Sequence, residues 1–519
     1  MAAPLTSWER LTAVATLGTG RAPLPAEGLW PDPALEQGDV VPESALLRAA
    51  AATYIWNLAG QRAVAQATAV AAADFARGDP ATDVSEPAAW RLARMINGDY
   101  KDLIPHWFTL ATENGRTLPP HWLPVVLEAL TPAARNEFAA VLGPAAQWLA
   151  SRNRKWALRA TTQAPSEERW NTGTLEERRA ELKAQRAADP ALARAWLQST
   201  WTTDPPEARE EFLQTLLIGL SADDETFLEA ALDDKRKGVR LAAAECLSRL
   251  PQSAHGGRNL ARLEPLLVFE DKKGGLFGGL RKRKLEVQLP SAVDKAATRD
   301  GIEAKPPAHR KIGERVFWLT QMIAMTPPTH WNTRFGCDAA TFIEAALATE
   351  YASELLTALS SAVARHPDRE WISALSTAWL NSTDDVQTIS QSLAALLLVA
   401  PDEHRLPLLE AQLRELGSHR FDIVFGVLQM IDLRWSPAAT QLALDGLAAS
   451  VRADRQQWAR ARNTLDSWAR RCDIGVAQRL VPPMLNACGE NSSWRNALEQ
   501  LNDIVEFRVA MNQELRRDG

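Results

Sequence analysis

Residues 221–251 restrict the possible folds of this chain more than any other stretch. Two runs with apolar residues at helical spacing lie on either side of a short charged turn, DDKRKGVR. Their apolar residues form two stripes: Phe227, Leu228, Ala231 and Leu232, then Val239, Ala243, Leu247 and Leu250. Positions three and four residues apart share one face of an α-helix. The segment therefore predicts two helices joined by a tight turn, each with one face to bury.

The polar residues of the same segment indicate how the pair begins and turns. Ser221 followed three residues later by Asp224 is typical of a capping box at a helix start. Asp234, Val239 and Arg240 carry the spacing of HEAT repeats, and the segment resembles that class, in which helix pairs stack into a solenoid. We expect Asp234 to cap the second helix and Arg240 to reach a neighbouring turn.

Helical patterns extend through most of the 519 residues, so the predicted fold is all-α. A chain this long exceeds one compact core, but a solenoid avoids that limit because each repeat contacts only its neighbours. We predict a HEAT-like α-solenoid of stacked helix pairs with an N-terminal helical bundle and one long irregular insertion. The expected segments are the bundle over 1–160, repeats over 161–255, the insertion over 256–312 and C-terminal helical repeats over 313–519.

The predicted insertion contains the least helical sequence in the chain. Within it, residues 270–312 hold four closely spaced glycines, a basic run and one strand-like alternation, LEVQL. A long segment of this kind is either functional or disordered. It is a docking element for a protein partner or an insertion without a binding role, and the sequence leaves both open. The candidate partner-binding residues are Leu276, Phe277, Arg281, Lys282, Arg283 and Lys284.

A second candidate surface surrounds Trp148 and Trp156. Four basic residues are interleaved with these tryptophans: Arg152, Arg154, Lys155 and Arg159. Such a patch could stack bases and bind phosphate, which makes a nucleic-acid-binding solenoid the alternative function. The interpretation that we favour is a helix whose tryptophans pack while its arginines cover the surface. The net charge of −6 also argues against nucleic acid as the main partner.

Motifs for catalysis, cofactors and metals are not found in the sequence. It contains no GxxxxGK[ST], no HExxH and no GxSxG, and its four cysteines form no CxxC pair. The longest apolar run, near residues 392–400, is about half a membrane span. We expect a non-catalytic cytoplasmic protein without cofactor or metal, bound to other proteins and not to membranes. An active site without a motif, between helices, is a third possibility, and the oligomeric state stays open.

Several longer strings resemble one family more closely than a generic repeat does. They include GPAAQWLASRN, the stretch ADDETFLEAALDDKRKGVRLAAAECLSRLPQS, RKLEVQLP and FWLTQMIAMTPPTHW, with SWERLTAVATLGTGR and FRVAMNQEL near the two ends. These strings are similar to a bacterial domain-of-unknown-function family of HEAT-like helical proteins. Its genes commonly lie beside those of a MoxR-type AAA ATPase, a von Willebrand factor A domain protein and a SWIM zinc-finger protein. The resemblance implies an accessory role, with the ATPase or the von Willebrand factor A protein as partner.

Overall fold

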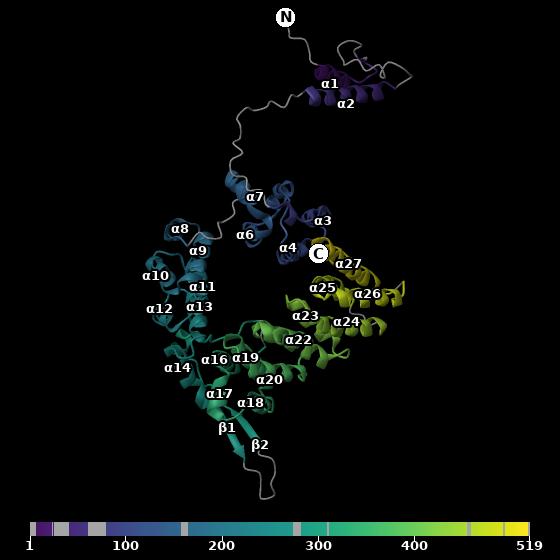
Figure 1. Ribbon diagram of the computed structural model, residues 1–519. Helices are drawn as coiled ribbons and strands as arrows, with labels where there is room; N and C mark the ends of the chain where they lie inside the picture. Colours follow the sequence, from purple (N-terminus) through teal and green to yellow (C-terminus); the bar gives the residue numbers. More distant parts are fainter. Residues whose placement is uncertain are drawn as a thin grey trace. The chain divides into compact units, whose positions relative to one another are not determined.

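The protein divides into two units, residues 1–76 and 77–519. The computed structural model describes residues 7–22, 24, 41–60, 79–156, 165–272, 282–308, 311–453, 458–490, 492 and 494–516. Figure 1 shows these residues as helices and one β-hairpin. The all-α prediction is confirmed, because packed helix pairs make up both units and the described strands form one two-stranded sheet.

The described residues of the first unit include a pair of helices. They are α1 (Ser7–Leu17) and α2 (Pro42–Gly60), which pack against each other. Leu11 and Val14 of α1, and Ala49 and Thr53 of α2, are buried.

The second unit begins with five helices between residues 79 and 156. They are α3 (Glu86–Ile96), α4 (Ile104–Glu113), α5 (Leu123–Ala129), α6 (Pro132–Glu137) and α7 (Ala139–Arg152). A proline occupies one of the first two positions of α3 through α6, where its missing N–H leaves no hydrogen bond unmade. We call residues 79–156 the bundle segment.

Seven further helices follow between residues 167 and 263. They are α8 (Glu167–Thr172), α9 (Leu175–Ala188), α10 (Pro190–Thr200), α11 (Pro206–Thr215), α12 (Glu225–Ala231), α13 (Lys237–Ser248) and α14 (Ala254–Leu263). The helix pair predicted at 221–251 is confirmed as α12 and α13. Its two stripes are buried except for Leu250, which is partly buried.

The polar predictions for this pair are confirmed in part. Asp224 accepts a hydrogen bond from the backbone N–H of Ser221 at 3.1 Å, as the capping box requires. The prediction that Asp234 caps α13 is wrong. Its carboxylate accepts from the N–H of Arg236, one residue before α13 begins, and pairs with Arg209 of α11 at 2.9 Å. Arg240 donates to the carbonyls of its own turn, at Asp234 and Lys235, instead of a neighbouring one.

Much of the described part of the predicted insertion is regular. It contains an antiparallel hairpin of β1 (Leu267–Lys272) and β2 (Lys282–Val287), followed by α15 (Lys295–Arg299). The strand expected from LEVQL is confirmed as the end of β2, whereas β1 was not predicted. In this register Leu267 faces Val287, Phe269 faces Leu285, and Lys272 faces Lys282.

Twelve helices complete the second unit. They are α16 (Glu314–Ala324), α17 (Thr329–Phe335), α18 (Ala339–Leu347), α19 (Ala352–Arg365), α20 (Arg369–Leu380), α21 (Val386–Val399), α22 (Asp402–Leu416), α23 (Phe421–Met430), α24 (Pro437–Arg452), α25 (Trp458–Arg471), α26 (Ile474–Ala487) and α27 (Arg495–Leu515).

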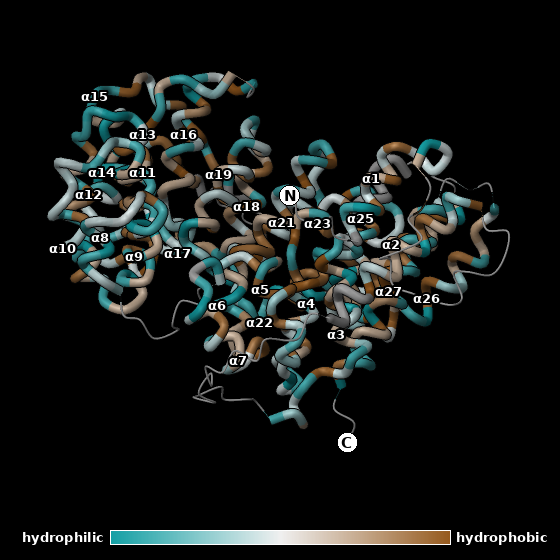
Figure 2. The backbone as a smooth tube through the Cα atoms, turned by 90° about the horizontal axis from the view of Figure 1, so that it is seen from above, coloured by the Kyte–Doolittle hydropathy of each residue, from teal (hydrophilic) through white to brown (hydrophobic). Residues whose placement is uncertain are grey.

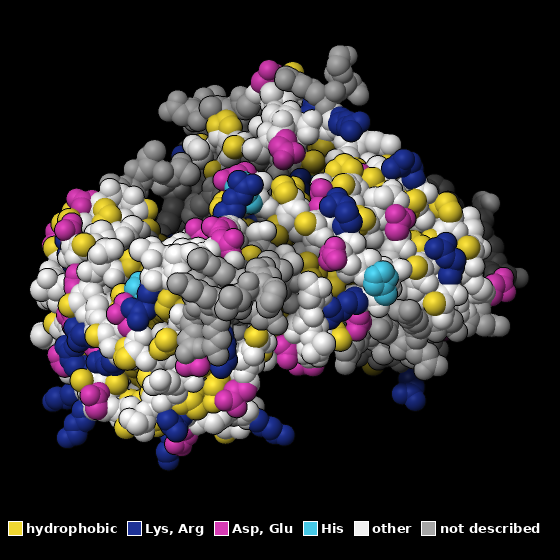
Figure 3. Space-filling view, turned by 90° about the horizontal axis from the view of Figure 1, so that it is seen from below, with side chains coloured by type: hydrophobic (Ala, Val, Ile, Leu, Met, Phe, Trp, Pro, Cys, Tyr) yellow, Lys and Arg dark blue, Asp and Glu magenta, His cyan; other side chains and the backbone are white. Residues whose placement is uncertain are grey.

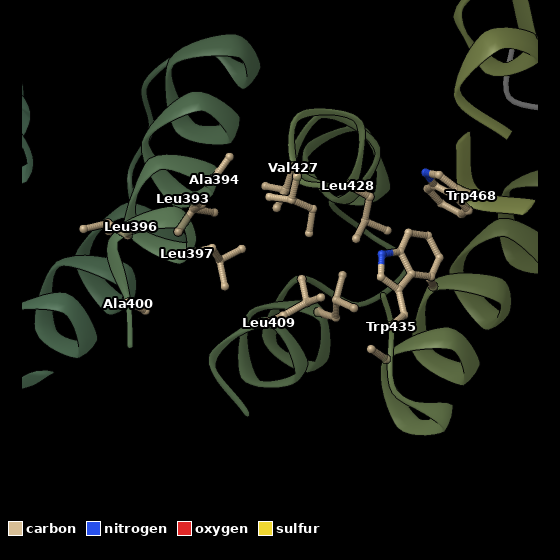
Figure 4. Packing of buried hydrophobic residues seen from close by; sticks show 14 of the residues in the cluster. Leu393, Ala394, Leu396, Leu397, Ala400, Leu409, Val427, Leu428, Trp435 and Trp468 are labelled. Carbon is tan, nitrogen blue, oxygen red and sulfur yellow. The ribbon is translucent and has the colours of Figure 1, made fainter. Parts of the chain in front are cut away.

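From α16 onward the helices stack in two layers. The first layer runs α16, α19, α21, α23, α25 and α27, and the second runs α18, α20, α22, α24 and α26. Hydrophobic and hydrophilic residues alternate along the helices in Figure 2, which is typical of helices that bury one face. Figure 4 shows the buried side between the layers, where Leu397, Leu409 and Val427 come from three successive helices.

The bundle segment packs against α27 and α25, the last two helices of the first layer, although some 400 residues separate α3 from α27 in sequence. Arg91 of α3 makes a bidentate ion pair with Glu514 of α27, at 2.5 and 2.6 Å. The ring of Tyr100 lies 4.8 Å from that of Phe507, and Asp102 pairs with Arg470 at 2.9 Å. We call this contact between residues 79–156 and the C-terminal helices the seam.

A fully buried ion pair ties three consecutive helix pairs together. Arg186 of α9 and Asp224 have side chains that are 0% exposed and meet at 3.0 Å. Burial raises the pKa of Asp224, but hydrogen bonds from Arg186 and Arg194 outweigh it and lower the pKa below its usual value. Arg186 also donates to four backbone carbonyls: Pro190, Leu216, Ile218 and Gly219. Three of these carbonyls, those of Leu216, Ile218 and Gly219, follow the end of α11, where carbonyls lack partners within the helix.

Replacing Arg186 by Met should destabilise residues 175–231 strongly. The variant leaves a buried carboxylate and several carbonyls without their donor, which costs about 3–5 kcal/mol. Hydrogen exchange of the α9, α11 and α12 amides measures the loss. The matched control is Asp99→Asn, which breaks an exposed pair with Arg94 and should cost less than about 1 kcal/mol. Equal protection in both variants would contradict the assigned role.

The seam should weaken in acid because of His106. This partly buried imidazole accepts a hydrogen bond from Arg434 through Nδ1, and burial, Arg434 and Arg508 lower its pKa from 6.5 to about 3. A folded-state pKa below the unfolded value gives stability that is complete above pH 6.5 and is lost as the pH falls toward 3. At pH 5 the loss is about 2 kcal/mol. Thermal unfolding at pH 7.5 and at pH 5 should show this loss of stability in the wild type and not in His106→Gln. An equal pH dependence of the two proteins would contradict the role of His106.

Candidate functional site

The structure describes only part of the candidate docking segment, which adjoins the β1–β2 hairpin. Three of the candidate docking residues fall outside the described residues: Leu276, Phe277 and Arg281. The other three begin β2: Lys282, Arg283 and Lys284. The side chain of Lys284 is exposed and lies 3.4 Å from Glu286 of the same strand. In the strand register, Lys272 at the end of β1 thus lies opposite Lys282 at the start of β2.

The opposite end of the hairpin is fixed to the helices. Leu267 and Leu285 are buried. The ring of Phe269 stacks at 5.1 Å on Phe335 of α17 and at 6.1 Å on Phe342 of α18. β2 packs against α18. A firm base therefore supports the predicted docking residues.

The described part of the Arg and Trp patch is engaged mainly in local packing. The guanidinium of Arg152 lies 5.6 Å from the ring of Trp148, and the indole of Trp156 donates to Glu128 at 2.7 Å. The Lys155 carbonyl accepts from Arg135 at 2.6 Å, and the side chains of Arg152 and Lys155 are exposed. The side chain of Arg154 and all of Arg159 lie outside the described residues.

Charges of both signs are mixed on the face of the molecule in Figure 3. Lys and Arg side chains alternate with Asp and Glu side chains there and do not join into a basic trough. A nucleic-acid-binding groove would require a continuous basic stripe along the backbone path. The face in Figure 3 shows no such stripe.

The buried carboxylates are neutralised by arginines within the fold. Asp300, 2% exposed, pairs with Arg258 at 2.6 Å and Arg262 at 2.7 Å. Burial raises its pKa, and these arginines outweigh burial and lower the pKa overall. Within the described ranges, no group of three or more His, Cys, Asp or Glu side chains could hold a metal ion. These carboxylates tie helices together, as Asp224 does.

A groove of about 910 Å³ lies along α18 and α20. Its floor is apolar and is formed by Ile343, Leu347, Ala374 and Ala378. Its edges carry exposed polar side chains, which are those of Asp338, Glu344, Arg369, Glu370, Ser373, Thr377 and Asn381. We call this hollow the α18–α20 groove. An apolar floor with polar edges is the usual form of a site that binds a ligand or a peptide.

The groove is wide because its facing side chains are small. α18 and α20 are neighbours in the second layer, and they present Ala340, Ser373, Ala374 and Thr377 toward the hollow. Leu347, at the end of α18, is 41% exposed. Trp371 and Trp379 of α20 are fully buried, and their indole N–H groups donate to Asn332 of α17 and to Ser360 of α19. The floor is therefore rigid while its apolar surface stays accessible.

The acidic edge of the groove is set by helix starts. Asp338 caps α18 and Asp368 caps α20, at 2.8 and 3.0 Å from the backbone N–H groups that they accept from. Glu370 accepts from the N–H of Ala339 at 2.9 Å and so joins the two helix starts. With Glu344, four acidic residues and one basic residue, Arg369, line the groove. The edge thus carries a net negative charge.

A second hollow, of about 350 Å³, lies on the first layer between α16 and α19. Its lining is mostly polar and includes Thr320, Gln321, Ser353, Thr357 and Arg365. Arg365 is paired with Glu245 of α13 at 2.8 Å. This hollow is smaller and less apolar than the α18–α20 groove, so it is the weaker candidate for binding a protein helix.

The sequence did not point to the α18–α20 groove. Its residues read as the ordinary solvent face of two amphipathic helices, because Ala, Ser and Thr are common on such faces. The available signal is the spacing of Ala340, Ile343, Glu344 and Leu347 in α18 beside Ser373, Ala374, Thr377 and Ala378 in α20. Two small-residue faces mark a groove only once the helices are known to be neighbours.

The chain belongs to a family of unknown function, DUF5691, whose model matches residues 10–515. No curated protein and no solved structure matches the chain. Among the described residues, no helix is both long and apolar enough to cross a membrane.

Proposed function

We propose that this protein is a non-catalytic, HEAT-like scaffold that binds another protein, and that the α18–α20 groove receives an amphipathic helix of that partner. The observation that carries the proposal is the apolar floor of the groove between small side chains and an acidic edge. Helix-in-groove recognition uses anchors at positions i, i+3 or i+4, and i+7 of the bound helix.

The dimensions of the groove suit a short helix. α18 has nine residues, so at a rise of 1.5 Å per residue it spans about 14 Å. That length accommodates two to three turns of a bound helix. The acidic edge favours Lys or Arg beside the apolar anchors, because opposite charges at an interface rim speed association and exclude wrong partners.

The β1–β2 hairpin supplies a second proposed contact. It shares α18 with the groove: Phe342 stacks on the hairpin, and the next residue, Ile343, lines the groove. A partner seated on α20 and α18 would lie next to the hairpin base. The family resemblance suggests a MoxR-type AAA ATPase or a von Willebrand factor A domain protein as this partner, with the chain as an accessory to that system in the cytoplasm.

The groove is tested with a labelled 18-residue amphipathic peptide that has Leu at the anchor positions and Lys at the flanks. Fluorescence anisotropy should show binding to the wild type and at least tenfold weaker binding to Thr377→Arg, about 1.4 kcal/mol. Thr377 is exposed on α20, so Arg fills the groove without disturbing the core. Ala395→Arg, at an exposed position of α21 outside the groove, is the matched control and should bind normally.

A charge swap sharpens the same experiment. Glu344→Lys should weaken binding of the Lys-flanked peptide and improve binding of a Glu-flanked version relative to the wild type, since the groove is then lined by three acidic and two basic residues instead of four and one. Absence of binding by the wild type, or equal binding by Thr377→Arg and Ala395→Arg, would rule out the groove as the docking site.

The hairpin contact is tested by replacing residues 273–281 with Asn-Gly. A two-residue Asn-Gly loop suits a hairpin, and the register places Lys272 opposite Lys282 at its two ends. The helical fold should persist by circular dichroism, while affinity for the MoxR-type ATPase or the von Willebrand factor A protein of the same genome should fall. Unchanged affinity would remove the hairpin from the site, and failure of the wild type to bind either protein would refute this partner.

A further inference from the structure

Arg508 of α27 is a buried cation without a carboxylate partner among the described residues. It is 4% exposed, and its Nη1 donates to the carbonyls of Ala469 and Cys472 at 2.6 and 2.8 Å. Its buried Nε has no hydrogen-bond partner in the described part of the chain. A guanidinium stays charged in proteins, and a buried charge without a counterion is costly. The seam therefore contains a positive charge that lacks compensation.

A second arginine and a histidine leave another buried N–H group without an acceptor. Arg434, in the loop between α23 and α24, is exposed and donates to Nδ1 of His106 on α4. An arginine can only donate, so Nδ1 is the acceptor and the neutral imidazole carries its proton on Nε2. This Nε2 is buried and has no hydrogen-bond partner within the described residues.

His106, Arg434 and Arg508 belong to elements that meet at the seam. α4 packs against α27. Burial lowers the pKa of His106 most, and Arg434 and Arg508 lower it further. Burial also lowers the pKa of Arg508, and Arg434 adds to this effect. Electrostatic effects of this kind act between neighbouring groups. We call these three residues the seam cluster.

The acidic side chains around the seam cluster have other partners. Two of them form ion pairs with arginines of α25, at 2.9 and 3.0 Å: Asp102 with Arg470, and Asp432 with Arg471. Asp473, which acts on Arg508, is the N-cap of α26. Across the residues that the structure describes, no carboxylate pairs with Arg434 or Arg508. The charge of the cluster thus remains available to an anion from solution.

We propose that the seam cluster binds a small, doubly charged oxyanion of the sulfate or phosphate class. Two guanidinium groups balance its charge, and their N–H groups suit its oxygen atoms as acceptors. The Nε2–H of His106 and the Nε–H of Arg508 also gain an acceptor. The ligand is a free ion, because Arg508 at 4% exposure is reached more readily by a small solute than by a macromolecule.

The bound anion strengthens the seam. It joins α4 of the bundle segment to α27 and to the loop that contains Arg434. A ligand that binds the folded state alone stabilises that state increasingly as its concentration rises. The concentration of the oxyanion therefore sets how firmly the bundle segment is held against the C-terminal helices. This site is independent of the α18–α20 groove.

Equilibrium dialysis of the full chain with labelled sulfate, at constant ionic strength, tests the proposal. The wild type should bind sulfate, and Arg434→Gln should bind it at least about tenfold more weakly, because one charge-assisted contact is lost. Arg434 is exposed, so this variant leaves the core intact. The matched control is Arg414→Gln, at an exposed position of α22, which should bind sulfate normally. No binding by the wild type, or equal binding by the two variants, would overturn the proposal.

The pH dependence of sulfate binding tests the contact with His106. Sulfate keeps its charge between pH 7.5 and 5, and a bound anion favours the protonated imidazole. The wild type should therefore bind sulfate more tightly at pH 5 than at pH 7.5, whereas His106→Gln should bind it equally at both. A wild type without this pH dependence would contradict the contact.

Competition distinguishes a free ion from a phosphate ester. Inorganic phosphate should displace the labelled sulfate from the wild type. Phenyl phosphate should displace it less effectively, because its ring must enter beside the buried Arg508. Equal displacement by the two compounds would contradict the assignment to a free ion.

Discussion

The structure depends on one constraint: a pair of helices buries only part of its apolar surface internally, and the rest must be covered by neighbours. Each pair from α8 to α27 therefore needs a pair before it and a pair after it. Arg186 shows how neighbouring pairs are joined, because one guanidinium binds Asp224, the carbonyl of Pro190 at the start of α10, and the carbonyls of Leu216 and Gly219 after the end of α11. At the far end of the stack, the bundle segment covers α27 through Arg91 and Tyr100.

The groove proposed for recognition is a place where this covering is incomplete. Between α18 and α20 the small side chains around Thr377 leave an apolar floor open. The groove has an acidic edge and a rigid base, which suits a short basic amphipathic helix. Stacking thus accounts for stability and for recognition in the same physical terms.

The sequence predicted what is local. Apolar spacing placed α12 and α13, and the Ser221–Asp224 pair identified a helix start. It did not predict what depends on distant segments. Asp224 was interpreted as a cap alone, because Arg186 lies 38 residues away in sequence and nothing local marks the two as partners. β1 was missed because a short strand such as LVFEDK becomes recognisable only through its pairing with β2.

The candidate site follows the same division. The hairpin was noticed for its glycines and basic residues, which are visible in the sequence. The α18–α20 groove was not, because it results from the packing of two helices whose exposed residues are individually unremarkable in composition. Neither Ala374 nor Thr377 is a residue type that indicates a binding site in a sequence. Both side chains are small, and this leaves the groove open where α18 and α20 meet.

Hydrogen exchange of the full chain, with and without the Lys-flanked amphipathic peptide, tests the central claim most directly. Exchange reports which amides a bound helix protects, without any substitution in the protein. The account predicts added protection in α18 and α20, around residues 340–347 and 370–381, and little change in α16 and α19. Protection confined to the hollow between α16 and α19, or no added protection while the peptide is bound, would contradict it.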